Sequence, residues 1–323
     1  MGFLSRLMGG ADSGASQVDA AAQARQQARQ AERISHEIDA AYYRWLTGSA
    51  RYDAPAEVQA TILDQVRGLT ARPEEAAGLV PRVPEVIPQL LNSLAEEDVS
   101  ASELSRLVVQ DVVLTAEVIR EANSAYYRPM TQVKTVEAAI MMLGQNGLRM
   151  LLARVAFRPI IKMQADGFSR RAAPHVWGQS ERCALAASLV APGLTAGVFE
   201  AYLAGLMQNV GLIVAFRLAD RICPNATIPG GDDFAHELLA CGRQLSAGIA
   251  RHWEFPQEVT EAIEHAGDPG ELHLAQALSL GDRIAKLRLL IDAAVVAEDD
   301  DLVTEGLDSF QRRCLGKLSH LEA

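Results

Sequence analysis

The sequence predicts an all-α protein, organised as a multi-helix bundle with a helical extension at its N-terminus. Apolar residues recur at spacings of three and four over most of the chain, which is the period of a helix that buries one face. Runs that alternate polar and apolar residues, as in half-buried β-strands, are essentially absent. A content of 49% hydrophobic residues supplies enough apolar surface to build such a bundle around a core.

Two helices form the predicted extension, residues 1–76. Residues 1–16 are rich in Gly, Ser and Ala and are expected to be a mobile arm. A helix over residues 17–47 follows, which Gly48 can end, and Pro55 fits the first turn of a second helix. Their apolar stripes are Ile34, Ile38, Ala41 and Trp45 in the first and Val58, Ile62, Val66 and Leu69 in the second. The extension either packs on the main domain or serves as a coiled-coil or dimerising arm.

Prolines mark the start of the main domain, residues 77–285. Residues 73–88 contain four prolines and are expected to form a boundary and a loop. Ser100 and Glu103 have the spacing of a capping box at the start of a helix. Thr135 can cap a later helix that Gly144 can end. Further helices are expected over residues 172–191, 198–218, 233–253, 256–265, 272–291 and 301–318, the last within a C-terminal segment, residues 286–323.

Composition excludes several classes of function. The four cysteines lie far apart without a CxxC pair, so buried free thiols are expected rather than a zinc site or a disulfide framework. A formal charge of -11 opposes nucleic-acid binding. No apolar run reaches the ~20 residues of a membrane span, and residues 1–10 lack the core of a signal peptide, so a cytoplasmic protein is expected. Motifs of phosphate-binding loops, serine hydrolases and zincins are absent.

Residues 79–285 carry a series of short motifs, of which the most characteristic is the block at residues 122–127, Ala-Asn-Ser-Ala-Tyr-Tyr, followed by Ala-Ile and Leu-Gly in the next helix. This series resembles the HDOD family of bacterial signalling proteins, which are relatives of the HD phosphohydrolases. The residues of this structural motif are Asn123, Ser124, Tyr126, Gly144 and Trp253. Each also has a packing role: Asn123 can bond the backbone at a helix end, Gly144 can adopt a left-handed conformation, and Trp253 can fill a corner before a proline.

The same resemblance places a catalytic metal site where this chain lacks most of the ligands. The name-giving His-Asp pair corresponds to Gln208 and Asn209, and an upstream histidine corresponds to Gln179. The other implied positions are Gln244, the pair His265 and Ala266, and Asp282. Because neutral amides are weak ligands, no metal, no cofactor and no enzymatic activity are expected. The amides are predicted to form a polar cluster that either cross-links the helices or accepts a small ligand.

One group of basic residues, which we call the basic run, contrasts with the net negative charge of the chain. It consists of Arg149, Arg154, Arg158 and Lys162, and Pro159 is expected to break the helix that carries it. The run is either a solvated face or a docking patch for an acidic protein surface or a phosphate. His175, His236 and His252 have no cysteine or acidic neighbour at ligand spacing and are expected to be surface or satisfied core residues.

The resemblance implies a non-catalytic module of bacterial signal transduction that works by protein–protein interaction. The implied partners are histidine kinases, response regulators or cyclic-dinucleotide enzymes, bound in trans, and a homodimer is a further option. One alternative is a small-molecule sensor that binds a nucleotide in the former metal pocket. The other is a residual metal-dependent phosphohydrolase that depends on His265 or Asp282.

Overall fold

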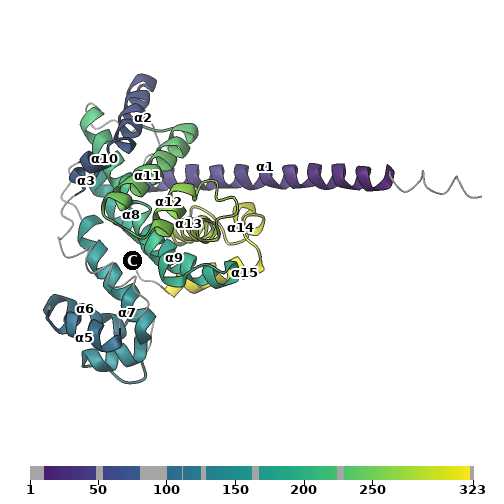
Figure 1. Cartoon of the computed structure of the whole chain (residues 1–323). Coiled ribbons are helices and arrows are strands. Elements are labelled where there is room, and N and C mark those ends of the chain that lie inside the picture. Colours follow the sequence, from purple (N-terminus) through teal and green to yellow (C-terminus); the bar gives the residue numbers. More distant parts are fainter. Residues whose placement is uncertain are drawn as a thin grey trace, which may run out of the picture.

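The computed structural model describes residues 11–48, 54–80, 100–110, 112–124, 129–161, 167–223 and 229–320. Within these ranges every regular element is a helix, which confirms the predicted all-α class. Figure 1 shows a compact bundle, a smaller lobe formed by α5, α6 and the start of α7, and one long helix that projects from the bundle.

The projecting helix is α1 (Ala11–Thr47), whose last third is buried in the bundle (Figure 1). It ends at Gly48, as predicted, where φ is +58°. It starts at Ala11, so residues 11–16, which were expected to belong to the mobile arm, are helical. Tyr42, Tyr43 and Leu46 join the core of the main bundle. The C-terminal part of the extension therefore packs on the main domain.

Two further helices of the N-terminal region complete this packing. α2 (Ala56–Thr70) follows Pro55 as predicted and buries Ile62, Val66 and Leu69. α3 (Pro73–Leu79) lies where a loop was expected, which was wrong because Pro73 occupies the first turn, where its missing N–H costs no hydrogen bond. Both pack on α10 and α11. The predicted domain boundaries stay predictions.

The small lobe is made of α5 (Ala101–Gln110), α6 (Val112–Ala122) and the first part of α7 (Val136–Ile161). α5 begins directly after Ser100, as expected. Thr135 caps α7 by accepting a hydrogen bond from the Ala138 N–H, 3.1 Å away. Gly144, with φ 69° and ψ 176°, kinks α7 where it was expected to end a helix. The break expected at Pro159 is absent, and α7 continues to Ile161. Pro159 cannot donate a backbone hydrogen bond, but it lies in the last turn of the helix, where this loss affects few residues.

The main bundle consists of the remaining helices. They are α8 (Gly167–Val190), α9 (Val198–Met207), α10 (Val210–Ile222), α11 (Asp232–His252), α12 (Gln257–His265), α13 (His273–Asp292), α14 (Asp301–Thr304) and α15 (Ser309–Lys317), with short 3-10 turns at Ala191–Leu194 and Leu318–His320. Two predicted single helices, 198–218 and 301–318, are each divided. The second divides because Asp308 forms a capping box with Gln311 and starts a new helix. The first divides at Gln208 and Asn209, which places two polar side chains inside the core.

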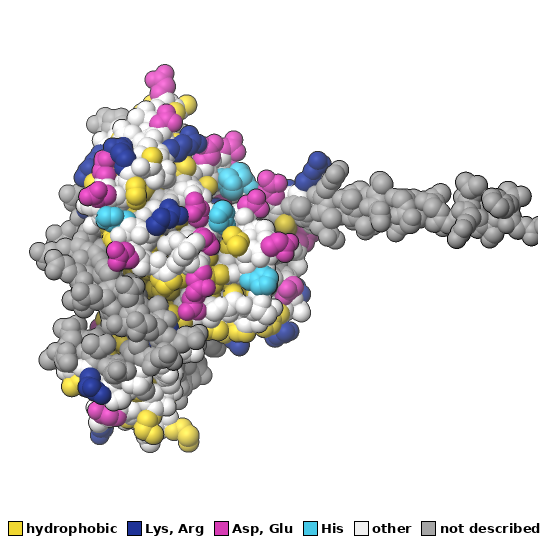
Figure 2. Space-filling view, viewed as in Figure 1, with side chains coloured by type: hydrophobic (Ala, Val, Ile, Leu, Met, Phe, Trp, Pro, Cys, Tyr) yellow, Lys and Arg dark blue, Asp and Glu magenta, His cyan; other side chains and the backbone are white. Residues whose placement is uncertain are grey.

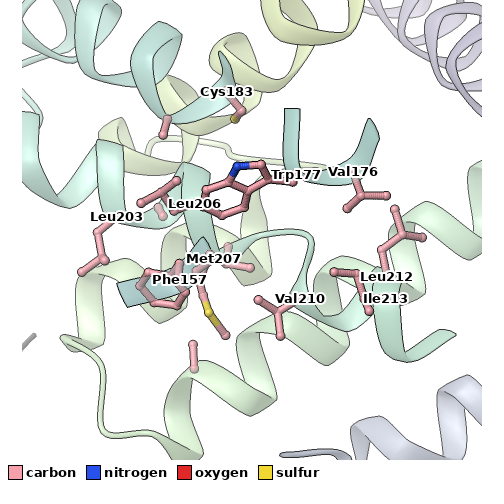
Figure 3. Close-up of a cluster of buried hydrophobic side chains, with 14 of the residues drawn as sticks. Phe157, Val176, Trp177, Cys183, Leu203, Leu206, Met207, Val210, Leu212 and Ile213 are labelled. Carbon is pink, nitrogen blue, oxygen red and sulfur yellow. The ribbon is translucent and has the colours of Figure 1, made fainter. Parts of the chain in front are cut away.

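The centre of the bundle is packed by apolar side chains from several helices, among them Trp177, Leu206 and Met207 (Figure 3). α10 and α11 touch closely at Gly211, where an added Cβ would lie 2.3 Å from the Gly242 carbonyl oxygen. Residues 198–222 are apolar enough to cross a membrane by length and composition, but 89% of the most apolar window is buried inside the bundle. This apolar stretch is therefore accounted for as the core of the fold.

Candidate functional site

The division between α9 and α10 builds a cluster of amides at the centre of the bundle. Gln208 ends α9 and Asn209 precedes α10, and only 1% and 7% of these residues are exposed. Ser246 of α11 fixes the turn between them, because its hydroxyl donates to the Gln208 carbonyl oxygen at 2.6 Å and accepts from the Gly211 N–H at 2.8 Å. Gln179 of α8 completes the set of amides and is fully buried.

Asp282 of α13 is the acceptor that joins these amides. Its Oδ1 accepts from Gln179 Nε2 at 2.6 Å and from Gln208 Nε2 at 3.0 Å. Asn209 Nδ2 in turn donates to the Gln179 side-chain oxygen and to Ser180 Oγ, the latter at 3.0 Å. The four residues Gln179, Gln208, Asn209 and Asp282 form what we call the amide cluster. It links three segments of the bundle, α8, the α9–α10 turn and α13, through hydrogen bonds.

The positive charge next to the amide cluster comes from a lysine. Lys286 Nζ lies 2.6 Å from Asp282 Oδ2 and 2.6 Å from Oδ1 of Asp39, which belongs to α1. Only 3% of the Lys286 side chain and 6% of the Asp39 side chain are exposed. His236 of α11 lies 3.2 Å from the other Asp39 oxygen, and the ring of Tyr42 lies 5.5 Å from the ammonium. The extension thus contributes directly to the site.

The electrostatics favour the charged forms of this buried pair. Burial alone raises the pKa of Asp39, but Lys286 and the hydrogen bond from His236 outweigh it and hold that pKa well below its ordinary value. Burial lowers the pKa of Lys286, and the carboxylates of Asp282 and Asp39 reverse the effect, so the net shift is upward. Burial, aided by Asp282, raises the pKa of the nearby Cys183 thiol well above its ordinary value. At neutral pH these shifts favour an ion pair beside a neutral thiol.

The residues present do not fit the metal ion that the resemblance noted from the sequence implies at this site. Both oxygens of Asp282 already accept hydrogen bonds, from two amides and one ammonium. Gln244 is exposed and donates to the Glu264 carbonyl oxygen at 2.8 Å, and His265 is exposed at the end of α12. Ala266, at the last implied position, is buried without a ligating group. Over the part of the chain that the structure describes, no three His, Cys, Asp or Glu side chains are placed to share a metal.

The described residues of the structural motif lie in two places, with Asn123, Ser124 and Gly144 in the small lobe and Trp253 in the main bundle. Asn123 Nδ2 donates to the carbonyl oxygens of Ile119 and Val133 at 2.7 and 2.8 Å, and its Oδ1 accepts from the Val133 N–H at 2.8 Å. Trp253 is 9% exposed and packs next to Phe255. Ser124 is partly buried, and Tyr126 lies outside the described residues. Asn123 therefore ties the end of α6 to the segment that leads into α7.

The two arginines of the basic run whose side chains the structure describes do not contribute to an open patch. Arg149 is buried, with its guanidinium 4.2 Å from the centre of the Phe199 ring. Arg154 pairs with Glu121 and lies 3.8 Å from a Glu181 oxygen. Both are held within the protein because the face of α7 that carries them packs against neighbouring helices. The side chain of Arg158 and the whole of Lys162 lie outside the described residues.

Three residues of the site were missed from the sequence: Asp39, His236 and Lys286. His236 was expected to be a surface or satisfied core residue, and the structure shows that a distant helix supplies its acidic contact: its Nδ1 lies 3.2 Å from Asp39 Oδ2, and its ring centre lies 4.7 Å from that of His36. The sequence contained features that could have indicated Asp39 and Lys286, but these features also fit ordinary surface residues. Asp39 interrupts an apolar stretch of α1, and Lys286 lies four residues after Asp282 in a helix whose neighbouring side chains are apolar.

A cavity of about 800 Å³ lies beside this ion pair, between α1, α11, α13 and the loop that joins α12 to α13. The charged and titratable side chains that line it are Glu32, Asp39, His236, Arg243, Asp268, Asp282, Arg283 and Lys286. Gln179, Gln208 and Asn209 do not line it. Asp282 is thus the member of the amide cluster that reaches the cavity, while the three amides form hydrogen bonds that cross-link the helices.

Comparison with solved structures supports the fold. An HDOD domain protein of unknown function from Geobacter sulfurreducens has a TM-score of 0.58 and 21% identity, and the match covers 79% of this chain and 94% of that one. A candidate metal-dependent phosphohydrolase from Shewanella amazonensis SB2B has a TM-score of 0.55 and 18% identity, with 81% and 98% covered. A candidate signal transduction protein from Marinobacter aquaeolei VT8 has a TM-score of 0.55 and 22% identity, with 84% and 68% covered.

Comparison of sequences leads to the same family. An uncharacterised protein of Treponema pallidum (strain Nichols) is 23% identical over an alignment of 199 residues, and the match covers 57% of this chain and 37% of that relative. The chain thus matches little more than a third of the length of that relative. The family model of the HDOD domain matches residues 80–269, more than half of the chain. The chain belongs to the HDOD domain family.

Proposed function

We propose that this chain is a non-catalytic regulatory module of bacterial signal transduction that acts by binding protein partners. The observation that carries the proposal is the Lys286 ammonium, which lies 2.6 Å from oxygens of both Asp39 and Asp282. In a metal site, a bound cation balances the charge of the carboxylates. Here the ammonium of Lys286, which belongs to the chain itself, provides that positive charge. Fold alone does not decide function, so the chemistry of this cluster is the argument.

The cluster lacks what metal-assisted hydrolysis requires. Such catalysis needs a cation with an open position that can bind a phosphate oxygen and acidify a water. An ammonium held by two carboxylates has no such position, and the neighbouring Gln179, Gln208 and Asn209 are neutral amides committed to hydrogen bonds. The proposed role of the cluster is structural: it holds α1, α8, the α9–α10 turn and α13 in one arrangement.

The small lobe offers the surface that we propose for partner binding. Its exposed side chains include Val109, Met130 and Met141, which are 56%, 103% and 87% exposed. Figure 2 shows hydrophobic side chains at the exposed tip of this lobe. Methionine adapts to differently shaped apolar partners, and solvent-exposed apolar side chains that gather on one region commonly mark an interaction site. Histidine kinases, response regulators and cyclic-dinucleotide enzymes, bound in trans, are the proposed partners.

The test compares two apolar-to-charged substitutions in the full chain. Met141→Glu changes the small lobe, and Val295→Glu changes an exposed side chain, 51% accessible, on the loop after α13. Proteins that co-purify with the wild type from its own host are quantified against both variants. We expect specific partners to be lost with Met141→Glu and kept with Val295→Glu. Equal recovery with all three proteins would refute the proposed surface.

Catalysis is tested separately, with cyclic dinucleotides and nucleotide phosphates in the presence of Mn²⁺ or Mg²⁺. We expect no metal-dependent hydrolysis above the background of the buffer. Hydrolysis that disappears with Asp282→Asn would establish the residual phosphohydrolase and overturn the proposal. The small-molecule sensor is a second candidate function, favoured by the cavity of about 800 Å³ rather than by the amides.

A further inference from the structure

The cavity beside the Asp39–Lys286 pair has the size of a small-molecule site. Its volume of about 800 Å³ falls within the range of roughly 300–1,000 Å³ that is usual for ligand pockets. α1 contributes one wall, α11 and α13 contribute others, and the loop over residues 266–269 closes a further side. Its neutral lining is mixed: Leu194, Leu280 and Pro269 provide apolar surface, and Gln276 and Ser279 provide hydrogen-bonding groups.

Two arginines of the cavity, Arg243 and Arg283, lack the close carboxylate partners that Arg182, Arg251 and Arg288 of the same bundle have. Arg243 forms no hydrogen bond or ion pair with any residue that the structure describes. The Nε atom of Arg283 is buried without a partner, and its Nη1 reaches only a backbone carbonyl, at 3.3 Å. By contrast, Arg251 on the same helix as Arg243 pairs with Glu264 at 2.7 Å. Burying polar groups without partners is costly, so these guanidinium groups are suited to a further acceptor.

The charges of the cavity favour an anion. Among the buried and half-buried side chains of the lining, Arg243, Arg283 and Lys286 are three cations and Asp39 and Asp282 are two carboxylates, so these groups carry one positive charge in excess. Lys286 already engages both carboxylates, so they are not available to the arginines as close partners. Burial lowers the pKa of Arg283, and the more distant Asp282 and Asp39 offset this only in part. The other two acids of the lining, Glu32 and Asp268, are exposed to solvent, which screens their charge.

We propose that this cavity binds a phosphorylated small molecule of about mononucleotide size, with its phosphate held by Arg243 and Arg283. Guanidinium groups present paired donors that match the oxygens of a phosphate. The organic part of the ligand lies against the apolar lining of the cavity. The site is independent of the partner surface on the small lobe, so each proposal fails or succeeds on its own experiment.

The position of the cavity gives such a ligand a regulatory effect. Ser35 of α1 and Ser279 of α13 both line it, so one bound molecule contacts the extension and the main bundle together. A ligand that binds only when α1 is docked stabilises the docked state. We expect the bound ligand to slow hydrogen exchange in residues 34–46 of α1 and in the loop over residues 266–269.

The experiment measures binding of adenosine 5′-monophosphate, guanosine 5′-monophosphate and inorganic phosphate to the full chain by titration calorimetry. Adenosine serves as the probe without a phosphate. We expect at least one mononucleotide to bind in a 1:1 ratio, at least tenfold more tightly than adenosine. Arg243→Gln should weaken this binding at least tenfold, whereas Arg251→Gln, which removes a charge from the exposed part of the same helix, should leave it unchanged.

Three results would overturn the proposal. They are the absence of binding by all phosphorylated probes, equal binding of adenosine and its monophosphate, and unchanged binding in Arg243→Gln. If Arg243→Gln does not fold, Ser279→Phe replaces it, because a ring at that position fills the cavity without removing a charge. Binding that survives Ser279→Phe would likewise refute the assignment of the cavity.

Discussion

Replacing Lys286 with methionine is the sharpest test of the ion pair that joins α1 to α13. Methionine keeps most of the length of the side chain and removes the ammonium that lies 2.6 Å from both Asp39 and Asp282. The variant therefore leaves two carboxylates next to each other with no cation between them. Asp39 suffers most, because its side chain is only 6% exposed and its remaining partner is His236.

The size of the effect follows from burial. Breaking a buried ion pair by removing one partner costs about 3–5 kcal/mol, because the other charge stays behind without compensation. Asp282 keeps two amide donors, which reduces its share of the cost. We therefore expect Lys286→Met to lower the free energy of unfolding by about 3 kcal/mol at pH 7. Adding Asp39→Leu should restore a large part of this loss, since it removes the uncompensated charge.

The loss of stability should depend on pH in a defined direction. In the wild type the pKa of Asp39 is depressed, so its contribution is present above the ordinary carboxyl pKa of about 4 and is lost as pH falls further. In the variant, burial raises that pKa, so protonation at low pH relieves the penalty. The pKa of Lys286 is raised, and its contribution persists until pH rises through that value. The difference between the two proteins should therefore be largest between about pH 6 and 9 and should shrink towards pH 4.

Urea unfolding followed by circular dichroism at pH 4, 5.5, 7 and 8.5 measures this difference. Arg251→Met is the control, because it breaks an exposed pair that contributes at most about 1 kcal/mol. A loss below about 1 kcal/mol for Lys286→Met, equal at all four pH values, would refute the buried ion pair. Failure of Asp39→Leu to recover stability would show that the cost has another origin.

The remaining predictions concern the scaffold that positions the site. Gly211→Ala places a Cβ 2.3 Å from a backbone carbonyl oxygen of α11 and should lower the free energy of unfolding, measured in urea, by about 1–3 kcal/mol. The control Gly193→Ala meets no atom within 4 Å and should change that free energy little. Equal effects of the two substitutions would contradict the close contact. Asn123→Ala removes three hydrogen bonds and should destabilise the small lobe by about 2–3 kcal/mol, which faster hydrogen exchange in this lobe would reveal. Unchanged exchange there would contradict this role of Asn123. Asp308→Ala removes a capping box and should lower the free energy of unfolding by about 1 kcal/mol, which thermal unfolding monitors; an unchanged midpoint would show that the cap is not needed.

Helix positions were predictable where local chemistry decides them. Gly48 ends α1, Pro55 precedes α2 and Gly144 kinks α7, because each residue imposes a backbone conformation on its own segment. The break at Gln208 was not predictable from periodicity, because the residues on both sides continue the apolar pattern of one buried helix. It forms because Ser246, 38 residues away, bonds the backbone of the turn. Contacts of this kind depend on the tertiary fold.

The amide cluster was predictable in part, and the ion pair was not. The resemblance placed Gln179, Gln208, Asn209 and Asp282 at one site, and the structure brings these four together. The structure does not bring Gln244 or His265 into this cluster, because both side chains are exposed. Lys286 and Asp39 are 247 residues apart, and a charged residue on a helix is by default expected to face solvent. Only the packing of α1 on α13 turns them into a buried pair.

The lysine changes what can control the site. A metal site responds to the concentration of the ion, whereas an internal ammonium is always present and its charge balance depends on which helices are packed around it. Asp282 lies on the same helix as Lys286, whereas Asp39 comes from α1, so the second carboxylate of the pair depends on the packing of α1 on the bundle. α1 also contributes one wall of the cavity, and Asp282 belongs both to the cavity lining and to the amide cluster. The packing of α1 therefore completes the ion pair and the cavity, and Asp282 connects both of them to the amide cluster.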